Sequence, residues 1–495
     1  MSLFYSCNGQ ARVRLVQASA VLAAMASVAG CGAGYRPVVS PINPSGPAAQ
    51  PVAFIGIVSS PSPTAPGVLT VVDYAGDTIV DQIPIGPGPQ AFTMDETGST
   101  GYTVNSDGTL TNFPISSTAQ AKNVQYTTLP TGAKVVSLFS PSAGLWASDL
   151  NGNVTDVLSG FPATFKLAVP VAATPVMVIG PNLVSERNYA ITQNVPDPTG
   201  VACNTSPRTV SGAGEAEAIE ESSFTISAQI PLGKCPVYAI ESPDLRRIFV
   251  LNRGDDTITV INSQNNTLDA CTPFVNQNGQ PVTCHPSLPL SIAAGLTGAS
   301  VPALAGPVYA EYNTATSQLV VADYDGSAIS VIDVSLDIYG NDSPTFGTTF
   351  TIPVGVNPAS VTALYDGSRA YTANQSDGTV SEVNLVSHTL VKTLPVNGHP
   401  RTVGSVQNSL YGKVYVASPD SPYLTIIRTD QDIIDTTVLV QGNVVDVRVS
   451  TPNASQGNPN VVSRKPGFGQ PCYLPPTLLS PAAIAANPAA CATLP

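Results

Sequence analysis

Asp-Gly and Asn-Gly pairs recur along this chain at the spacing that begins a calcium-binding loop. The segments are 105–108, 149–152, 323–326 and 375–378, and their candidate ligand-facing aspartates are Asp107, Asp325 and Asp377. A calcium loop also needs a glutamate further along that binds the ion with both oxygens, and no segment has one at the required distance. Because Asp-Gly and Asn-Gly are also the preferred residues of tight hairpin turns, we predict turns here and no metal site.

Histidine is the other residue type that could do chemistry here. The chain has three histidines, and only His399, in the turn-like segment 397–400 beside Arg401, is placed where a loop could face a ligand. The sequence has no Cys-x-x-Cys-His haem motif, no Gly-x-Ser-x-Gly elbow and no His-Glu-x-x-His pair. We therefore predict no catalytic residue and no cofactor, and we keep His399 and Arg401 as candidate ligand-facing residues.

Residues 1–30 have the three parts of a secretory signal peptide. Arg12 and Arg14 make the start basic, the stretch from Leu15 to Val28 is mostly Ala, Val, Leu and Met, and small residues complete the segment. The apolar stretch is too short to cross a bilayer as a permanent helix, which takes about 20 residues. We therefore predict that residues 1–30 are removed on export.

The segment Val28-Ala29-Gly30-Cys31 resembles the bacterial lipobox, whose cysteine is acylated with chains such as palmitate and becomes the new N-terminus. The resemblance implies a lipid on Cys31 that anchors the protein, because each buried CH₂ contributes about 0.8 kcal/mol. Gly32 in place of Asp implies sorting to the outer membrane, as in Gram-negative lipoproteins. Residues 31–51 are Pro-rich, which predicts an extended tether facing the periplasm or the exterior.

Charge and composition limit the partners of the chain. Its 495 residues include 20 Lys and Arg against 33 Asp and Glu, for a net charge of −13, and the basic residues form no cluster. Nucleic acids bind to basic surfaces, so we predict no nucleic-acid partner. The abundance of Val and Thr, with 40 Gly and 46 Pro, indicates strands and turns.

Similar strand pairs recur through the chain. Each unit has an apolar strand, a turn, two alternating strands joined by a second turn, and then a turn that leads to one more strand. The strand pairs are 67–86, 256–270, 327–334, 378–398 and 423–442, and apolar strands precede four of them at 248–252, 319–323, 370–374 and 414–418. Four strands in about 40 to 50 residues are typical of β-propeller blades, which bury their faces against each other.

The units resemble the YVTN-type propeller repeat, in which a strand like Tyr-Val-Ala-Asn leads to Thr-Val-Ser-Val-Ile-Asp and then Val-Val-Ala-Thr-Ile-Pro-Val-Gly. The closest copies are 370–374 with 378–384 and 393–398, and 249–252 with 257–262. The resemblance covers about residues 52–450 and is weakest in 101–186. It implies an all-β propeller of four-stranded blades in residues 52–451.

Counting second strands gives eight blades, and seven, the commoner number in the family, is the alternative. The second strands start near Ala53, Gly101, Leu145, Arg187, Arg247, Gln318, Arg369 and Lys413. The repeat begins with a second strand at Val52 and ends with an innermost strand at 444–450, so both chain ends complete one blade. Such a closure removes a free sheet edge. Residues 452–495 remain as an irregular, Pro-rich tail.

Two insertions interrupt the repeat. Residues 195–213 extend the turn between the second and third strands of the fourth unit, and about residues 271–304 fall around the outer strand of the fifth unit. Both insertions contain cysteines, and six cysteines remain once Cys7 leaves with the signal and Cys31 is lipidated. An even number in an exported protein indicates three disulfides, for which 15 pairings exist.

The cysteine positions favour one set of pairs. Cys271 and Cys284 enclose one short segment, and Cys472 and Cys491 enclose the C-terminal tail. The propeller resemblance implies that the turn containing Cys203 and the loop containing Cys235 lie on one face, so we predict that these two pair.

Two functions remain open. The absence of a catalytic motif and the predicted anchor favour a non-catalytic binding or scaffold module for a protein or glycan partner in the cell envelope. The alternative is a propeller enzyme of lactonase or dehydrogenase type with its site at the mouth of the central funnel. Three or more convergent acidic, histidine or asparagine side chains there would favour the enzyme, and a Val-lined channel would exclude it.

Overall fold

A computed structural model describes residues 54–450, apart from residues 75, 96–97, 117–119, 141–143, 161, 181–185, 198–201, 276–278, 280, 293–302, 338–339 and 407–411. The predicted signal peptide, the lipidation site Cys31, the tether and the tail with Cys472 and Cys491 lie outside the described residues. The chain divides into two units, residues 1–40 and 41–495, and all described residues belong to the second.

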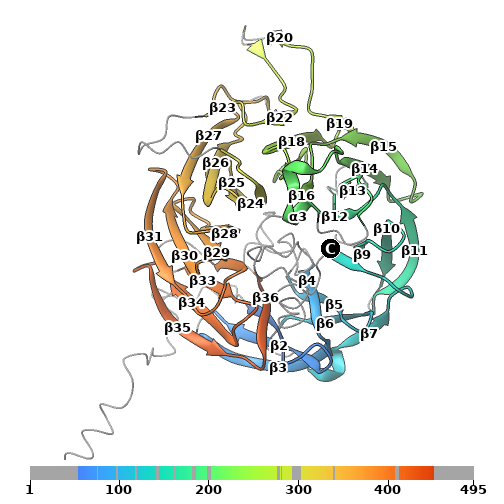
Figure 1. Cartoon of the computed structure of the whole chain (residues 1–495), viewed down its shortest axis with the longest axis vertical. Coiled ribbons are helices and arrows are strands. Elements are labelled where there is room, and N and C mark those ends of the chain that lie inside the picture. The colour runs from blue at the N-terminus through green and yellow to red at the C-terminus, as the bar shows by residue number, and fades with distance from the viewer. Residues whose placement is uncertain are drawn as a thin grey trace, which may run out of the picture. The chain divides into compact units, whose positions relative to one another are not determined.

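Eight antiparallel sheets form a ring around a central axis in the second unit (Figure 1). This confirms the predicted eight-bladed propeller. Blade one consists, from the axis outward, of β36 (Asn443–Val449), β1 (Phe54–Ser60), β2 (Pro66–Asp73) and β3 (Thr78–Pro87). The other blades use consecutive strands in the same order. Each of the eight predicted second strands is present, within one residue of its expected start.

Blades two to four follow in sequence. Blade two has β4 (Pro89–Met94), β5 (Thr100–Asn105), β6 (Thr109–Pro114) and β7 (Gln125–Thr128), with the 3₁₀ helix η1 (Ala121–Asn123) before β7. Blade three has β8 (Val135–Phe139), β9 (Leu145–Asp149), β10 (Val154–Ser159) and β11 (Thr164–Pro170). Blade four has β12 (Pro175–Ile179), β13 (Arg187–Thr192), β14 (Glu215–Glu220) and β15 (Ile226–Pro231).

Blades five to eight complete the ring. Blade five has β16 (Pro236–Glu241), β17 (Arg247–Asn252), β18 (Thr257–Asn262) and β19 (Thr267–Leu268). Blade six has β24 (Pro307–Asn313), β25 (Gln318–Asp323), β26 (Ala328–Asp333) and β27 (Thr348–Pro353). Blade seven has β28 (Pro358–Ala363), β29 (Arg369–Asn374), β30 (Thr379–Asn384) and β31 (Thr389–Pro395). Blade eight has β32 (Thr402–Val406), β33 (Lys413–Ala417), β34 (Tyr423–Arg428) and β35 (Ile433–Leu439).

The core lies between neighbouring blades. Inner strands bury both faces, so β29 is almost continuously buried, whereas the outermost β31 is mostly exposed. One cluster joins Phe249 of blade five, Val321 of blade six and Val361 of blade seven. Because each blade needs a neighbour on both sides, the repeat is stable only as a closed ring.

The two ends of the described chain close the ring in blade one, as predicted. β36 pairs antiparallel with β1, with Ile57 opposite Val447. Beyond the strand ends, the Ser450 N–H donates to the Phe54 carbonyl over 2.9 Å. The chain therefore enters and leaves the propeller side by side, and β36 covers the inner edge of β1.

Turns between the third and fourth strands of a blade contact the preceding blade. In blades one, four and eight, one non-glycine residue of this turn has a positive φ: Asp77 (51°), Phe224 (55°) and Asp432 (51°). The Tyr371 hydroxyl donates to Asp432 over 2.6 Å, and Phe224 lies 6.0 Å from Trp146, ring centre to ring centre. This places the single tryptophan in inter-blade packing. A left-handed backbone conformation costs free energy at a non-glycine residue, and in these turns it directs the side chain onto the neighbouring blade.

Both predicted insertions are present. The first, between β13 and β14, contains α3 (Ala202–Thr205) and the 3₁₀ helix η2 (Pro207–Thr209). The second leaves blade five after the two-residue β19 and forms a hairpin of β20 (Phe274–Val275) and β21 (Pro281–Val282). It returns through β22 (Ser287–Leu288), which pairs with β18, and β23 (Ser291–Ile292), which pairs with β27. No helix among the described residues is long and apolar enough to span a membrane.

Candidate functional site

Loops from all blades gather on one side of the ring, which we call the loop face. It consists of the turns between second and third strands and of the loops that lead into the innermost strands. Backbone hydrogen bonds tie these two sets together, as from the Gly254 N–H to the Lys234 carbonyl (2.9 Å) and from the Gln375 N–H to the Asn357 carbonyl (3.0 Å). The face includes all five loop residues that the sequence singled out.

Asp107 acts within its own turn, and Asp377 also binds the loop that leads into β28. The Asp107 carboxylate accepts from the Thr109 N–H (3.0 Å) and hydroxyl (2.6 Å). Asp377 accepts from the Val356 N–H (2.9 Å) and the Thr379 hydroxyl (2.7 Å). Both carboxylates are exposed and belong to different blades. They therefore stabilise turns, as the sequence indicated, and do not converge on a shared site.

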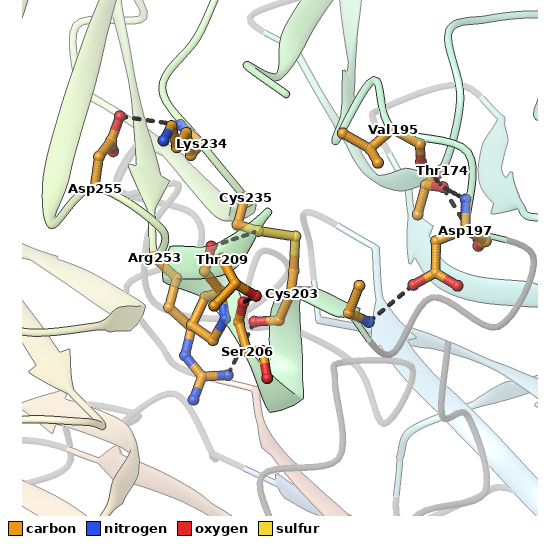
Figure 2. The surroundings of a disulfide bond; sticks show 12 residues. Thr174, Val195, Asp197, Cys203, Ser206, Thr209, Lys234, Cys235, Arg253 and Asp255 are labelled. Carbon is orange, nitrogen blue, oxygen red and sulfur yellow. Dashed lines mark hydrogen bonds between the residues drawn. A yellow bond between two sulfur atoms is a disulfide. The ribbon is translucent and has the colours of Figure 1, made fainter. Parts of the chain in front are cut away.

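Asp325 has a different environment, because two arginines bind it. The Arg253 guanidinium contacts its two oxygens at 2.7 and 3.3 Å, and Arg208 of η2 lies at 3.5 Å. Arg253 is 3% exposed, stacks over Tyr324 at 5.1 Å and donates to the Cys203 carbonyl (Figure 2). Blades five and six and the first insertion therefore meet at one buried arginine.

A disulfide holds the first insertion in this place. Cys203 of α3 and Cys235, which precedes β16, are both buried and bonded to each other (Figure 2). Cys271 and Cys284 form a second disulfide, so both predicted pairs that fall within the described residues are present. The predicted pair of Cys472 and Cys491 lies outside them. Two disulfides indicate an oxidising, exported compartment.

The side chains of His399 and Arg401 lie in different environments although the two residues are close in sequence. The His399 ring contacts the Asp420 carboxylate at 2.5 Å, and its backbone N–H donates to the same group over 2.8 Å. Arg401 is buried instead, and its charge acts on the carboxyl group of Asp446 in β36. Of the two candidates, only Arg401 therefore reaches the innermost strands.

Polar side chains from three innermost strands form a cluster that the sequence analysis missed; we call it the axial cluster. Its members are Tyr238 of β16, Tyr309 and Glu311 of β24, and Asp446 and Arg448 of β36. The registers place Tyr238, Tyr309 and Asp446 at equivalent positions, just after the bulge of each strand, and Glu311 and Arg448 two residues further. Side chains at alternate positions share one side of a strand, so all five belong to one surface.

Contacts inside the axial cluster are close. Arg448 binds Asp446 at 2.7 Å, and the rings of Tyr238 and Tyr309 stack at 4.9 Å. Glu311 accepts from the Ala363 N–H of blade seven over 3.3 Å. All five side chains are buried. The innermost strands therefore bury acids, a cation and phenols as well as Val.

Burial shifts the pKa values of Asp446 and Tyr309. It raises the pKa of Asp446, although the charges of Arg448 and Arg401 act in the opposite direction. Burial also raises the pKa of Tyr309 well above its usual value, with further contributions from Tyr238 and Glu311. A signal for these residues exists in the sequence: Pro-Val-Tyr-Ala-Glu and Val-Asp-Val-Arg place polar residues at alternate positions of otherwise apolar strands.

Buried amides lie at the loop-face end of the second strands. Gln193 and Gln375 occupy the position that Arg253 has in blade five, directly after the strand. Gln375 is completely buried, and among the described residues neither its amide oxygen nor its amide nitrogen has a hydrogen-bond partner; the same holds for the Gln193 nitrogen. An unsatisfied buried polar atom costs about 1–3 kcal/mol, so these two amides lower the stability of blades four and seven. Within the described ranges, no three His, Cys, Asp or Glu side chains gather as a metal site would require.

Comparison with solved structures supports the fold. The chain is similar to apo AztD from Citrobacter koseri, with a TM-score of 0.53 at 12% identity over 80% of this chain and 98% of that one. It is similar to the dihydro-heme d1 dehydrogenase NirN in complex with DHE, with a TM-score of 0.53 at 11% identity over 82% of this chain and 76% of that one. No model of a known protein family and no curated protein matches the sequence. At these identities the likeness shows the propeller fold alone, and the YVTN resemblance stays a prediction.

Proposed function

We propose that this chain is an exported lipoprotein, anchored through Cys31, whose propeller binds a protein or glycan partner of the cell envelope at the loop face. The observation that carries the proposal is the first insertion on the loop face, which the Cys203–Cys235 disulfide and the ion pairs of Arg208 with Asp256 and Asp325 hold against blades five and six.

The rigidity of this insertion supports binding at the loop face. The first insertion is fixed by the Cys203–Cys235 disulfide and by the contact of Arg253 with the Cys203 carbonyl. A loop face held in one conformation loses little entropy on binding. Disulfides also fit the exported compartment that the signal peptide and the lipobox-like segment predict.

Site-specific photocrosslinking in cells tests the proposal. A benzophenone amino acid at Thr209, exposed in η2 of the first insertion, is expected to crosslink one envelope component; the same group at Gln82, on the outer strand β3, is not. Adding Cys203→Ala/Cys235→Ala to the Thr209 probe is expected to lower the crosslink yield at least fivefold. The proposal is wrong if Thr209 and Gln82 give equal yields, or if the cysteine substitutions leave the yield unchanged.

A second candidate function has its own observation. The axial cluster brings the acid Asp446, the cation Arg448 and the phenol of Tyr309 together, and buried acids and phenols with raised pKa values, such as Asp446 and Tyr309, are typical of acid–base sites. An enzyme of lactonase or dehydrogenase type would use them. Assays of aromatic lactone hydrolysis and of dye reduction, each with wild type and Asp446→Asn, separate the candidates. Turnover that Asp446→Asn abolishes favours the enzyme, and its absence in both assays favours the binding module.

A further inference from the structure

A buried acid lies directly before the turn of blade six that binds the first insertion. Asp323 ends β25 and is completely buried, and Tyr324 and Asp325 follow it in the turn. The Asp325 carboxylate binds Arg253 at 2.7 Å and Arg208 at 3.5 Å. The Tyr324 ring lies 5.1 Å from the Arg253 guanidinium. A change at Asp323 therefore acts within two residues of the contacts that hold the insertion.

Three other blades have asparagine at the position of Asp323. Asn105, Asn252 and Asn374 end their second strands opposite the first residue of the innermost strand, as Asp323 does. The amide nitrogen of each donates to a hydroxyl of the third strand, as from Asn374 over 2.9 Å. In blade six the hydroxyl at that position belongs to Ser330 and lies 2.6 Å from Asp323. Only a protonated carboxyl group can donate there as the amides do.

The surroundings of Asp323 do not compensate a negative charge. Among the described residues, its Oδ1 has no hydrogen-bond partner, and the Ser330 hydroxyl and the Leu304 N–H are the donors near the carboxyl group. The charged groups that face it are two acids, Asp256 of the blade-five turn and Asp325 of its own turn, and both arginines are bound to these acids. Burial, with a further contribution from the two acids, raises the pKa of Asp323 well above its ordinary value. The folded loop face therefore keeps a proton that a solvated aspartate would lose.

We propose that Asp323 is a proton switch of the loop face, which keeps the first insertion in place while it is protonated and releases the insertion when the proton leaves. This inference rests on the proposed function, in which the same insertion binds the partner. A buried carboxylate is stabilised only by water or by a cation, and the adjacent turn has to move to admit either. Proton loss therefore weakens the contacts of Asp325 with Arg253 and Arg208. The loop face then binds its partner in acid and releases it as the medium becomes alkaline.

The direction of the effect follows from the affinity of each state for the proton. The state with the insertion in place holds the Asp323 proton more tightly than the released state, in which a solvated Asp323 ionises at about pH 4. The insertion is therefore held fully below about pH 4, and its attachment weakens as the pH rises toward the raised pKa of Asp323. Within this range the ratio of released to attached insertion grows by at most about tenfold for each pH unit.

Electron paramagnetic resonance of the purified full-length chain tests the switch. A nitroxide amino acid at Ser211, exposed just after η2, reports the mobility of the insertion and adds no cysteine beside the disulfides. For the labelled chain without further changes we expect a mobile component that is about fivefold larger at pH 8.5 than at pH 4.5. Asp323→Asn, which restores the residue of blades two, five and seven, is expected to stay immobile at both pH values. The matched control Asp149→Asn makes the same change in blade three and should respond as the unchanged chain does.

Each outcome decides one of the two proposals. Equal spectra of the unchanged chain at both pH values, or an undiminished response of Asp323→Asn, would overturn the switch. Loss of the response in Asp149→Asn as well would also overturn it, because the change would then belong to the whole ring. The label needs no partner: a response of the label without a crosslink from Thr209 supports the switch and contradicts the proposed partner, and a crosslink without a response of the label does the reverse.

Discussion

Lys413 and Asp77 are 336 residues apart in the sequence and form a buried ion pair, with 2.7 Å between the Lys413 Nζ and the Asp77 carboxylate. Lys413 begins the second strand of blade eight, and Asp77 is the left-handed turn residue of blade one. Lys413 also donates to the Tyr74 carbonyl over 2.6 Å. The pair therefore fastens the last blade to the first, at the seam where the ring closes.

Breaking this pair is expected to destabilise the whole ring. Lys413→Met leaves the Asp77 carboxylate buried without its cation, which costs about 3–5 kcal/mol. Urea unfolding followed by circular dichroism measures the loss. The control is Arg428→Met, which removes a partly exposed pair with Asp430 and is expected to cost less than about 1 kcal/mol. Equal effects of the two substitutions would show that the seam does not depend on the ion pair.

A buried pair of acids in blade three is expected to make stability depend on pH. Asn105, Asn252 and Asn374 each donate to a Ser or Thr of the next strand, whereas in blade three Asp149 faces Asp156 at that position. Burial and the Asp149 carboxyl raise the pKa of Asp156 to about 7. Burial also raises the pKa of Asp149.

The sign of the effect follows from the raised pKa. The folded state holds the Asp156 proton more tightly than the unfolded state, so this stability is complete below about pH 4 and is lost as the pH rises to about 7. Asp156→Thr, which restores the residue of blades two and five, is expected to stabilise the protein by about 1–2 kcal/mol at pH 7.5. Unfolding at pH 4.5 and 7.5 measures it. A gain as large at pH 4.5 as at pH 7.5 would contradict the proton-linked explanation.

Removing the first disulfide is expected to lower stability and release the first insertion. The residues are 32 apart in sequence, and for a loop of that length the chain-entropy model gives about 3–4 kcal/mol. The double variant Cys203→Ala/Cys235→Ala is compared with Cys271→Ala/Cys284→Ala, which opens a shorter loop. Peptide mapping without reduction checks the pairing itself: a peptide that joins Cys203 to Cys271 would refute it.

The lipid anchor predicts a simple fractionation result. Cys31→Ser removes the only acceptor of the lipobox-like segment, so the exported chain is expected to leave the membrane fraction and appear as soluble protein. Wild-type protein should stay with membranes at high salt, because acyl chains hold it by burial and not by charge. A Cys31→Ser chain that remains membrane-bound would rule out anchoring through this residue.

The sequence alone determined the architecture. Alternating strands and recurring turns gave eight second strands, and the strand types at the two ends predicted closure through β36 and β1. These features are local, since strand alternation and turn chemistry depend on neighbouring residues. The cysteine positions also led to the Cys203–Cys235 and Cys271–Cys284 pairs once the repeat was known. Asp107 and Asp377 lie in such local turns and accept hydrogen bonds from the hydroxyls of Thr109 and Thr379.

Only the tertiary structure decided which polar residues meet. Tyr309 and Arg448 are far apart in sequence and act on each other because the ring brings their strands to one axis. Arg253 and Asp325 pair because adjacent blades place their turns side by side. Residue types and spacing do not predict such contacts, because the contacts depend on how many blades close the ring and on how each strand is rotated. The fold could therefore be predicted from the repeat, whereas the axial cluster had to be seen.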